Sequence, residues 1–148
     1  MTQEEIIKKL RPAFAKLPVR LAYLYGSYAT DETHPKSDID IAVVWSEGIK
    51  MFGFKIAPEL QEALGSSIPE IDVRDISLNT EPVFLANVLK PAKPIFARSE
   101  KERIRFEVTA WKNFWDTQHS RDIFNYYMYK RIKEGKYGRG TPNYQKTA

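Results

Sequence analysis

The sequence predicts an α/β (α+β) protein in which a small mixed sheet of about four strands is flanked by helices. Segments with helical hydrophobic spacing alternate along the chain with short segments rich in β-branched and aromatic residues. The chain has 148 residues, of which 43% are hydrophobic, and this suits one domain with a buried core. We expect four helix–strand pairs followed by one long helix.

The first half of the chain alternates between the two kinds of segment. Residues 3–16 place apolar side chains at helical spacing, although Pro12 lies inside the segment. Residues 19–26 have an alternating side-chain pattern that is rich in β-branched and aromatic residues, and this predicts a strand. Residues 28–36 predict a short helix or a loop, and residues 38–45 predict a second strand.

The middle of the chain predicts two more helices with a strand between them. Residues 52–64 have helical character. Residues 68–77 alternate apolar and acidic side chains around Ile71 and Val73, and this predicts a third strand. Thr80 is the expected N-cap of the next helix, with Pro82 in its first turn and an end near Leu89.

The last predicted elements are a short strand and a long helix. The stretch KPIFARS, residues 93–99, predicts the strand, and Ser99 with Glu102 matches a capping box for a helix that begins at Glu100. We expect a break near residues 117–120. One apolar stripe is expected to face the core, formed by Ile104, Val108, Trp111 and Trp115.

These segments suggest three parts. We expect a core over residues 1–98 and a C-terminal helical extension over residues 99–138 that packs on the core, on a partner or on both. Gly135 and Gly138 are expected to end the helical segment. Residues 139–148 are expected to form a disordered tail.

Composition restricts the function classes. The net charge is +4, but residues from Lys130 onward carry +5, so the rest of the chain carries −1. A basic tail favours an acidic partner or is a solvated terminus, and the near-neutral body argues against direct nucleic-acid binding. The absence of cysteine excludes disulfides and thiolate metal sites. We expect no membrane span, no signal peptide and a cytoplasmic location.

Two aspartates head the second predicted strand. Asp38 and Asp40 are separated by one residue and precede an apolar run. Side chains at positions i and i+2 of a strand share one face, so the two carboxylates repel each other unless a cation lies between them. Mg²⁺ prefers carboxylate oxygens and shares its remaining positions with substrate phosphates. An Asp-x-Asp pair alone is also common in loops and strand-start caps.

A third carboxylate is expected from the next strand. Asp72 lies between Ile71 and Val73, although Asp75 is an alternative. Three carboxylates would allow two metal ions to be held about 3.5–4 Å apart.

A Gly-Ser pair follows the first predicted strand. Gly26 and Ser27 end that strand and begin a turn, where backbone N–H groups can approach a phosphate and a hydroxyl can add a hydrogen bond. The combined pattern is more specific than either motif alone.

The combined pattern resembles a known signature. Gly26-Ser27, ten further residues and then Asp38-Ile39-Asp40 are similar to the GSx10DxD motif of the nucleotidyltransferase superfamily related to DNA polymerase β. The short chain looks like the minimal nucleotidyltransferases of that superfamily, which are commonly encoded beside HEPN-domain proteins as toxin–antitoxin pairs. The resemblance covers residues 19–45 strongly, 68–76 fairly and the chain beyond residue 100 only in general terms.

The resemblance implies a polymerase β-like fold and a set of site residues. Asp38, Asp40 and Asp72 would bind Mg²⁺, with two ions expected, and Asp72 could help to deprotonate the attacking hydroxyl. The nucleotide-binding residues would be Gly26, Ser27 and Ser37.

The resemblance also implies a reaction. The chain would transfer AMP from ATP to a tyrosine of a HEPN toxin, release pyrophosphate and so act as an antitoxin, in a homo-oligomer or hetero-oligomer. One alternative is a catalytically silent antitoxin that neutralises its partner by binding. Another is a small-molecule nucleotidyltransferase, although 148 residues leave little room for a separate substrate domain.

One dipeptide departs from the family pattern. Many members have Arg-Gly where this chain has Thr30-Asp31, so Asp31 adds negative charge near the expected phosphate site. Lys36 could compensate for this charge.

The C-terminal third is rich in aromatic residues. It contains more of them than a helix needs on one face in order to dock on a sheet. We expect part of them to face the core and the rest to form a protein contact. They are Trp111, Phe114, Trp115, Phe124, Tyr126, Tyr127, Tyr129 and Tyr137.

Overall fold

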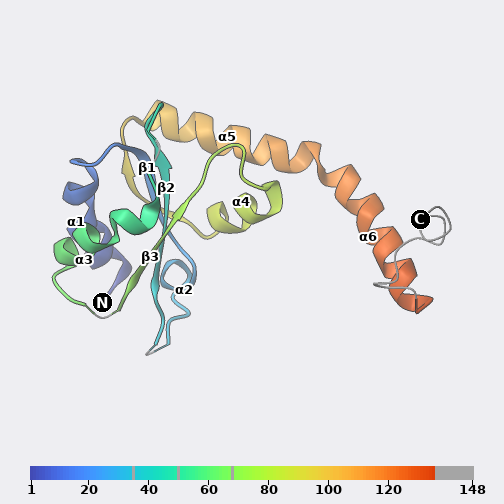
Figure 1. Cartoon of the computed structure of the whole chain (residues 1–148), viewed down its shortest axis with the longest axis horizontal. Helices are drawn as coiled ribbons and strands as arrows, with labels where there is room; N and C mark the ends of the chain where they lie inside the picture. The colour runs from blue at the N-terminus through green and yellow to red at the C-terminus, as the bar shows by residue number, and fades with distance from the viewer. Residues whose placement is uncertain (35, 50, 68, 136–148) are drawn as a thin grey trace. The chain divides into compact units, whose positions relative to one another are not determined.

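The computed structural model describes residues 1–34, 36–49, 51–67 and 69–135. The chain divides into two units, residues 1–112 and 113–148, which are described separately below. Figure 1 shows the order of the elements along the chain. The strands are β1 (Val19–Tyr25), β2 (Ile39–Trp45), β3 (Ile71–Asp75) and β4 (Lys93–Ala97). The helices are α1 (Gln3–Phe14), α2 (Ser27–Thr30), α3 (Ala57–Leu64), α4 (Pro82–Leu89), α5 (Glu100–Asp116) and α6 (Gln118–Lys133), with a 3-10 turn η1 (Gly53–Lys55).

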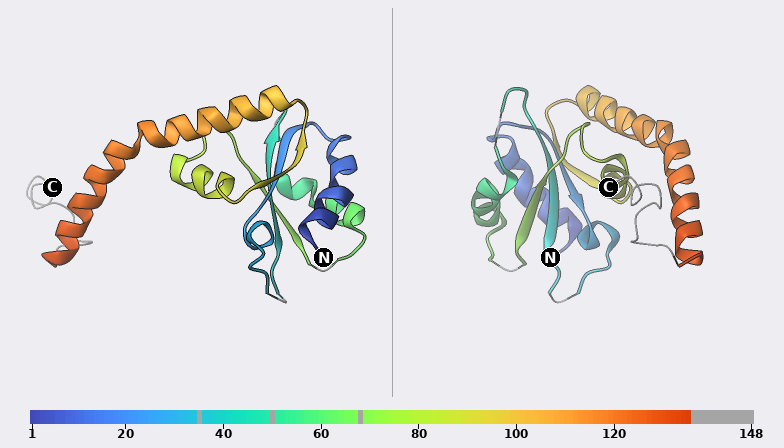
Figure 2. Two further views of the ribbon diagram at one scale, coloured as in Figure 1. Left: turned by 180° about the vertical axis from the view of Figure 1, so that it is seen from behind. Right: turned by 45° about the vertical axis from the view of Figure 1, so that its right-hand side comes forward.

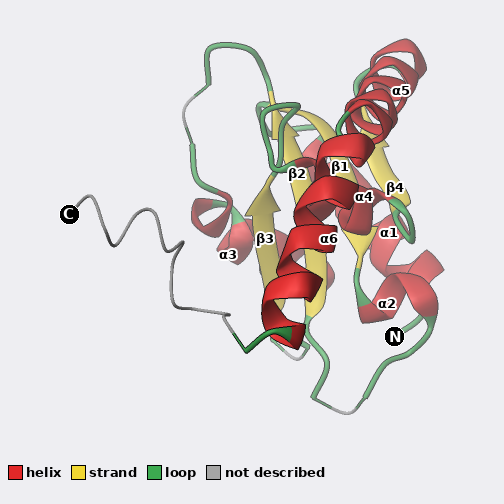
Figure 3. Ribbon diagram, turned by 90° about the vertical axis from the view of Figure 1, so that its right-hand side faces the viewer, coloured by secondary structure: helices red, strands yellow, loops and turns green. Residues whose placement is uncertain are grey.

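The four strands that the structure describes in the first unit form one mixed sheet, which confirms the predicted fold class. Their order is β3-β2-β1-β4, as Figure 3 shows. β1 is antiparallel to both β2 and β4, whereas β2 and β3 are parallel. The parallel pair places the N-terminal ends of β2 and β3 side by side, so the residues that begin these strands are neighbours.

Two hydrophobic layers cover the two faces of the sheet. One face packs against α1 and α3, with Leu10 and Leu60 fully buried, and the other packs against α4 and the first part of α5. Figures 1 and 2 show α1 and α3 on one side of the sheet and α4 on the other. The central strands β1 and β2 are therefore buried on both sides, which explains their nearly continuous apolar sequences.

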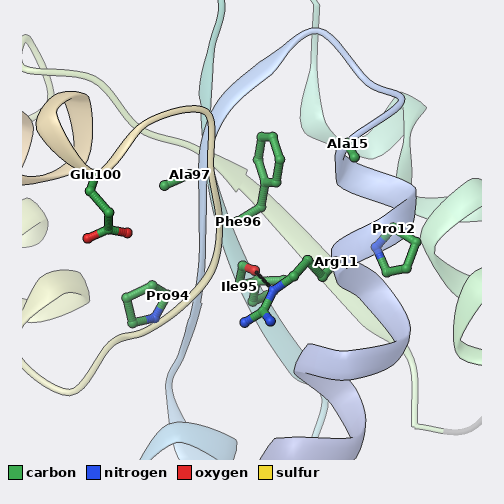
Figure 4. A pocket seen from close by; sticks show the side chains of 8 residues that line it. All are labelled: Arg11, Pro12, Ala15, Pro94, Ile95, Phe96, Ala97 and Glu100. Carbon is green, nitrogen blue, oxygen red and sulfur yellow. Dashed lines mark hydrogen bonds between the residues drawn. The ribbon is translucent and has the colours of Figure 1, made fainter.

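Helix α1 passes through Pro12 without ending. Its N-terminus has a complete capping box between Thr2 and Glu5, and it continues to Phe14, which is fully buried. Arg11 links the helix to the sheet, because its Nε donates a hydrogen bond of 3.0 Å to the backbone oxygen of Ile95 (Figure 4). Tertiary packing therefore outweighs the local cost of the proline.

The prediction for the N-cap of α4 is wrong. Glu81 is the N-cap, and its carboxylate accepts hydrogen bonds of 2.9 and 2.8 Å from the N–H groups of Val83 and Phe84. Thr80 instead accepts a hydrogen bond from the Ser77 N–H within the preceding turn. Pro82 is the first helical residue, as predicted.

Most of the apolar stripe predicted for α5 does not face the core: Trp111 is partly buried against it, whereas the other three residues are exposed. Ile104 is 52% exposed and Val108 is 61% exposed, whereas Phe106 and Ala110 are buried against the sheet. Apolar residues occupy more than one face of this helix, so the periodicity alone could not identify the buried face. Of the expected capping box, the serine half is present, because Ser99 Oγ accepts a hydrogen bond from the Glu102 N–H.

The second unit contains the end of α5 and helix α6. The predicted break is confirmed at Thr117, whose hydroxyl donates to the backbone oxygens of Asn113 and Phe114. No described residue of α6 is buried, and its aromatic side chains are exposed. Gly135 follows the helix with a φ of 71°, whereas Gly138 and the expected tail lie outside the described residues. The three-part division of the chain stays a prediction.

No helix in the described ranges is both long and apolar enough to cross a membrane.

Candidate functional site

Two of the three predicted carboxylates lie in one row across the sheet. Asp40, on β2, is in register with Asp72 on β3 and with Tyr25 on β1. Asp38 directly precedes β2 and is exposed. The parallel pairing of β2 and β3 therefore brings together aspartates that are more than 30 residues apart in the sequence.

The electrostatics of Asp40 show that these acids interact. Partial burial raises the pKa of the Asp40 carboxyl, and the charges of Asp72 and Asp38 raise it further, while Arg74 lowers it. Burial and the charge of Asp40 also raise the pKa of Tyr25 to about 12. The site therefore carries negative charge that is only partly compensated, which favours binding of a cation.

Position 26 requires a glycine, because of its backbone conformation and its close approach to Asp40. Its φ of 72° and ψ of −151° lie in a region that is almost restricted to glycine. A Cβ at this position would lie 2.3 Å from Asp40 Oδ2. The backbone at Gly26 therefore passes directly against the carboxylate, and Ser27 follows as the first, half-buried residue of α2.

Ser37 has a local structural contact. Its hydroxyl accepts a hydrogen bond of 2.7 Å from the His34 N–H, and its own N–H donates to the His34 oxygen at 2.9 Å. These bonds close the turn that leads into Asp38. A direct contact between Ser37 and the nucleotide stays a prediction.

Asp31, which departs from the family pattern, is held by the N-terminal helix. It has a φ of 59° and ends α2, and its Oδ1 accepts a hydrogen bond of 3.2 Å from Gln3 Nε2. Its carboxylate therefore takes part in joining α2 to α1. Lys36, the base that could compensate for it, is exposed.

Asp72 fits the third-carboxylate position better than Asp75 does. Asp75 is in register with Val43, and its Oδ1 accepts a hydrogen bond of 2.8 Å from Trp45 Nε1. Because side chains alternate along a strand, Asp75 lies on the face opposite to Asp72.

Sequence reasoning missed two neighbours of the carboxylates. Tyr25 lies beside Asp40 in the sheet, and Arg74 Nε lies 3.7 Å from Asp72 Oδ2. The spacing of Arg74, two positions after Asp72 on a strand, could have indicated that the two side chains share a face. Only the register shows that Tyr25 belongs to the same row.

The residues present fit a hard divalent cation in chemical type. Across the described parts of the chain, no three His, Cys, Asp or Glu side chains are placed to hold one ion together. Mg²⁺ does not require such a cage, since it is commonly held by one or two carboxylates, water and substrate phosphates. Asp38, Asp40 and Asp72 can supply those carboxylates.

A surface hollow lies elsewhere, between α1 and β4. It has a volume of about 410 Å³ and contains none of the predicted site residues (Figure 4). Its lining residues are Arg11, Pro12, Ala15, Pro94, Ile95, Phe96, Ala97 and Glu100.

A mixed sheet with a Gly-Ser turn packed against a row of aspartates is the arrangement that the sequence resemblance implies. Residues 5–101 match the sequence profile of the family described as Polymerase beta, Nucleotidyltransferase. Because this match covers more than half of the chain, the chain belongs to this nucleotidyltransferase family.

Individual relatives are similar in sequence and in structure. The protein adenylyltransferase MntA of Shewanella oneidensis is 37% identical over 78 residues, which are 52% of this chain and 55% of MntA. The chain thus matches about half the length of this curated relative. A crystal structure of a toxin–antitoxin with AMP-PNP contains a chain that is 27% identical, with a TM-score of 0.62, over 84% of this chain and 95% of that one.

A second solved structure is a mutant of the MntA–HpeT toxin–antitoxin. Two aspartates, two positions apart, are replaced by glutamate in that mutant. The matching chain is 25% identical, with a TM-score of 0.63, over 84% of this chain and 95% of that one.

Proposed function

We propose that this chain is a Mg²⁺-dependent protein adenylyltransferase that transfers AMP from ATP to a tyrosine of a cognate HEPN-domain toxin and so acts as an antitoxin. The observation that carries the proposal is the row formed by Asp40 and Asp72, with Asp38 before it and the Gly26 backbone packed against it. Family membership and the similarity to toxin–antitoxin chains support it.

In the proposed reaction, the tyrosine oxygen attacks the α-phosphorus of ATP. An O–P bond forms to the tyrosine, the bond from the α-phosphorus to the bridging oxygen breaks, and pyrophosphate leaves. Asp72 accepts the phenolic proton, directly or through water. When bound, Mg²⁺ would offset charge on the attacking and leaving oxygens.

The rest of the site positions the substrates. Asp38 and Asp40 hold the cation, and the Gly26-Ser27 turn receives the phosphates through its backbone N–H groups. The central strand β2 fixes Asp40 relative to that turn, because Ile39 and the four residues after Asp40 are buried in the sheet.

A label-transfer assay tests the proposal. The purified protein is mixed with Mg²⁺, ATP labelled at the α-phosphate and the product of the adjacent gene. Label on the partner that disappears with Asp38→Ala/Asp40→Ala would support AMP transfer, and its loss with Tyr→Phe variants of the partner would identify the acceptor residue.

Stoichiometric binding is the second candidate function. The exposed aromatic side chains of α6 favour a protein contact. If no label is transferred and both wild type and the double variant form a tight complex, neutralisation by binding replaces AMP transfer as the proposed function.

A further inference from the structure

Arg74 is the cation that the structure places against the carboxylates. It is in register with Ala42 on β2, two pairs along from the Asp40–Asp72 pair, and it lies on the same face of β3 as Asp72. Arg74 Nε lies 3.7 Å from Asp72 Oδ2.

The negative charges of the site outnumber its positive charges. Asp38, Asp40 and Asp72 carry three negative charges, and Arg74 supplies one positive charge. Arg74 acts on Asp40 as well as Asp72, since it opposes the rise in the pKa of the Asp40 carboxyl. Among these four described side chains, the balance is two negative charges, which is the charge that one divalent cation would offset.

The pairing between Arg74 and Asp72 can be broken at small cost. The two side chains are 58% and 51% exposed, and exposed ion pairs contribute little to stability. A divalent cation that approaches Asp72 can therefore displace the guanidinium. While it remains in place, the guanidinium lies beside an oxygen of Asp72 and repels the incoming cation.

We propose that Arg74 is an internal counter-ion of the carboxylate row, which competes with the divalent cation for Asp72 and so sets the cation concentration at which the site fills. This inference rests on the proposed function of the three aspartates as cation ligands. Arg74 is thus a residue that acts through Asp72, as its counter-ion in the metal-free protein.

A different role for Arg74 is protection of a sheet edge. β3 is the last strand on one side of the described sheet, and charged residues on edge strands prevent pairing with other chains. In that role, Arg74 would have no effect on cation binding, so the two explanations make different predictions.

The test measures binding of Mn²⁺ alone, as a spectroscopic substitute for Mg²⁺, without nucleotide. We expect Arg74→Gln to tighten Mn²⁺ binding about two- to fivefold, the range given by the strength of an exposed ion pair. Arg74→Lys retains the charge and should bind nearly as wild type does. In an Asp72→Asn background, Arg74→Gln should have little further effect.

Arg105→Gln is the matched control. It makes the same change of charge at an exposed position of α5, where Arg105 lines a hollow with Arg20 and Glu47, at the other end of the strands. We expect its Mn²⁺ affinity to equal that of wild type.

The outcomes separate this role from the proposed function. Mn²⁺ binding that depends on Asp40 but is unchanged or weakened by Arg74→Gln would overturn the counter-ion role alone. Absence of any Mn²⁺ binding that depends on Asp40 would overturn the metal site itself, and the role of Arg74 with it.

Discussion

Asp40 combines two opposing demands on one residue. It lies at the start of a buried strand, beside two other carboxylates, and the same surroundings that suit a cation disfavour its own ionised form. Residues arranged for function often reduce stability in this way.

Asp40→Asn should therefore separate activity from stability. We expect the proposed AMP transfer to fall at least about 100-fold, since the substitution removes a carboxylate that we propose as a ligand of the cation. A folded-state pKa above the ordinary value means that the ionised carboxylate destabilises the fold, so the metal-free variant should have a higher melting temperature at pH 7.

The stability difference between Asp40→Asn and wild type should depend on pH. The carboxyl favours folding only when it is protonated, so its contribution is lost as pH rises from the ordinary value of 3.8 through the raised folded-state pKa. The higher stability of Asp40→Asn relative to wild type should therefore decrease as the pH falls below 3.8. Thermal melts in EDTA measure this, with Glu62→Gln on α3 as an exposed control. A variant less stable than wild type at pH 7 would contradict the prediction.

Gly26→Ala should disturb both the backbone and the site. The added Cβ would meet Asp40 Oδ2 in a backbone conformation that other residues rarely adopt, so we expect a loss of about 1–3 kcal/mol in the free energy of unfolding. Cation binding should weaken as well, because Asp40 must move. Denaturant unfolding and Mn²⁺ titration measure the two effects.

Gly65→Ala is the control for backbone strain without a steric contact. Gly65 has a φ of 80°, but nothing lies within 4 Å of a Cβ there. We expect a loss of about 1 kcal/mol and unchanged cation binding. Equal effects of the two substitutions on Mn²⁺ affinity would show that the approach of Gly26 to Asp40 does not matter for the site.

At the scale of elements, α5 shows how packing selects one face of a helix. Phe106 is 5% exposed and Val108 is 61% exposed, although both are apolar residues of the same helix and unit. We expect Phe106→Ala to cost about 3–5 kcal/mol and Val108→Ala to change stability by less than about 0.5 kcal/mol. Chemical denaturation measures both, and similar losses would mean that the other face of α5 is also buried.

At the scale of the whole molecule, the candidate site and the basic, aromatic-rich end of the chain belong to different units. The carboxylate row lies in the first unit, whereas α6 and the segment that carries a charge of +5 belong to the second. The proposed binding of a nucleotide and the proposed binding of a partner protein would therefore use different regions of the chain.

Removing residues 130–148 tests this separation. We expect binding of the partner protein to weaken more than binding of ATP, because the deletion removes the basic charge of this end but none of the site. Calorimetric titration with each ligand measures the two affinities. Equal losses would indicate a structural role for this end of the chain.

The sequence by itself determined the alternation of elements, the fold class and the candidate residues from Gly26 to Asp40. These features depend on local spacing, since residues two apart share a strand face and a glycine can turn the chain after a strand. The neighbours of Asp40, the pairing of Arg74 with Asp72 and the exposed stripe of α5 were decided by the tertiary structure alone. Which strands become neighbours, and which face of a helix is buried, depends on packing of the whole core, to which every element contributes.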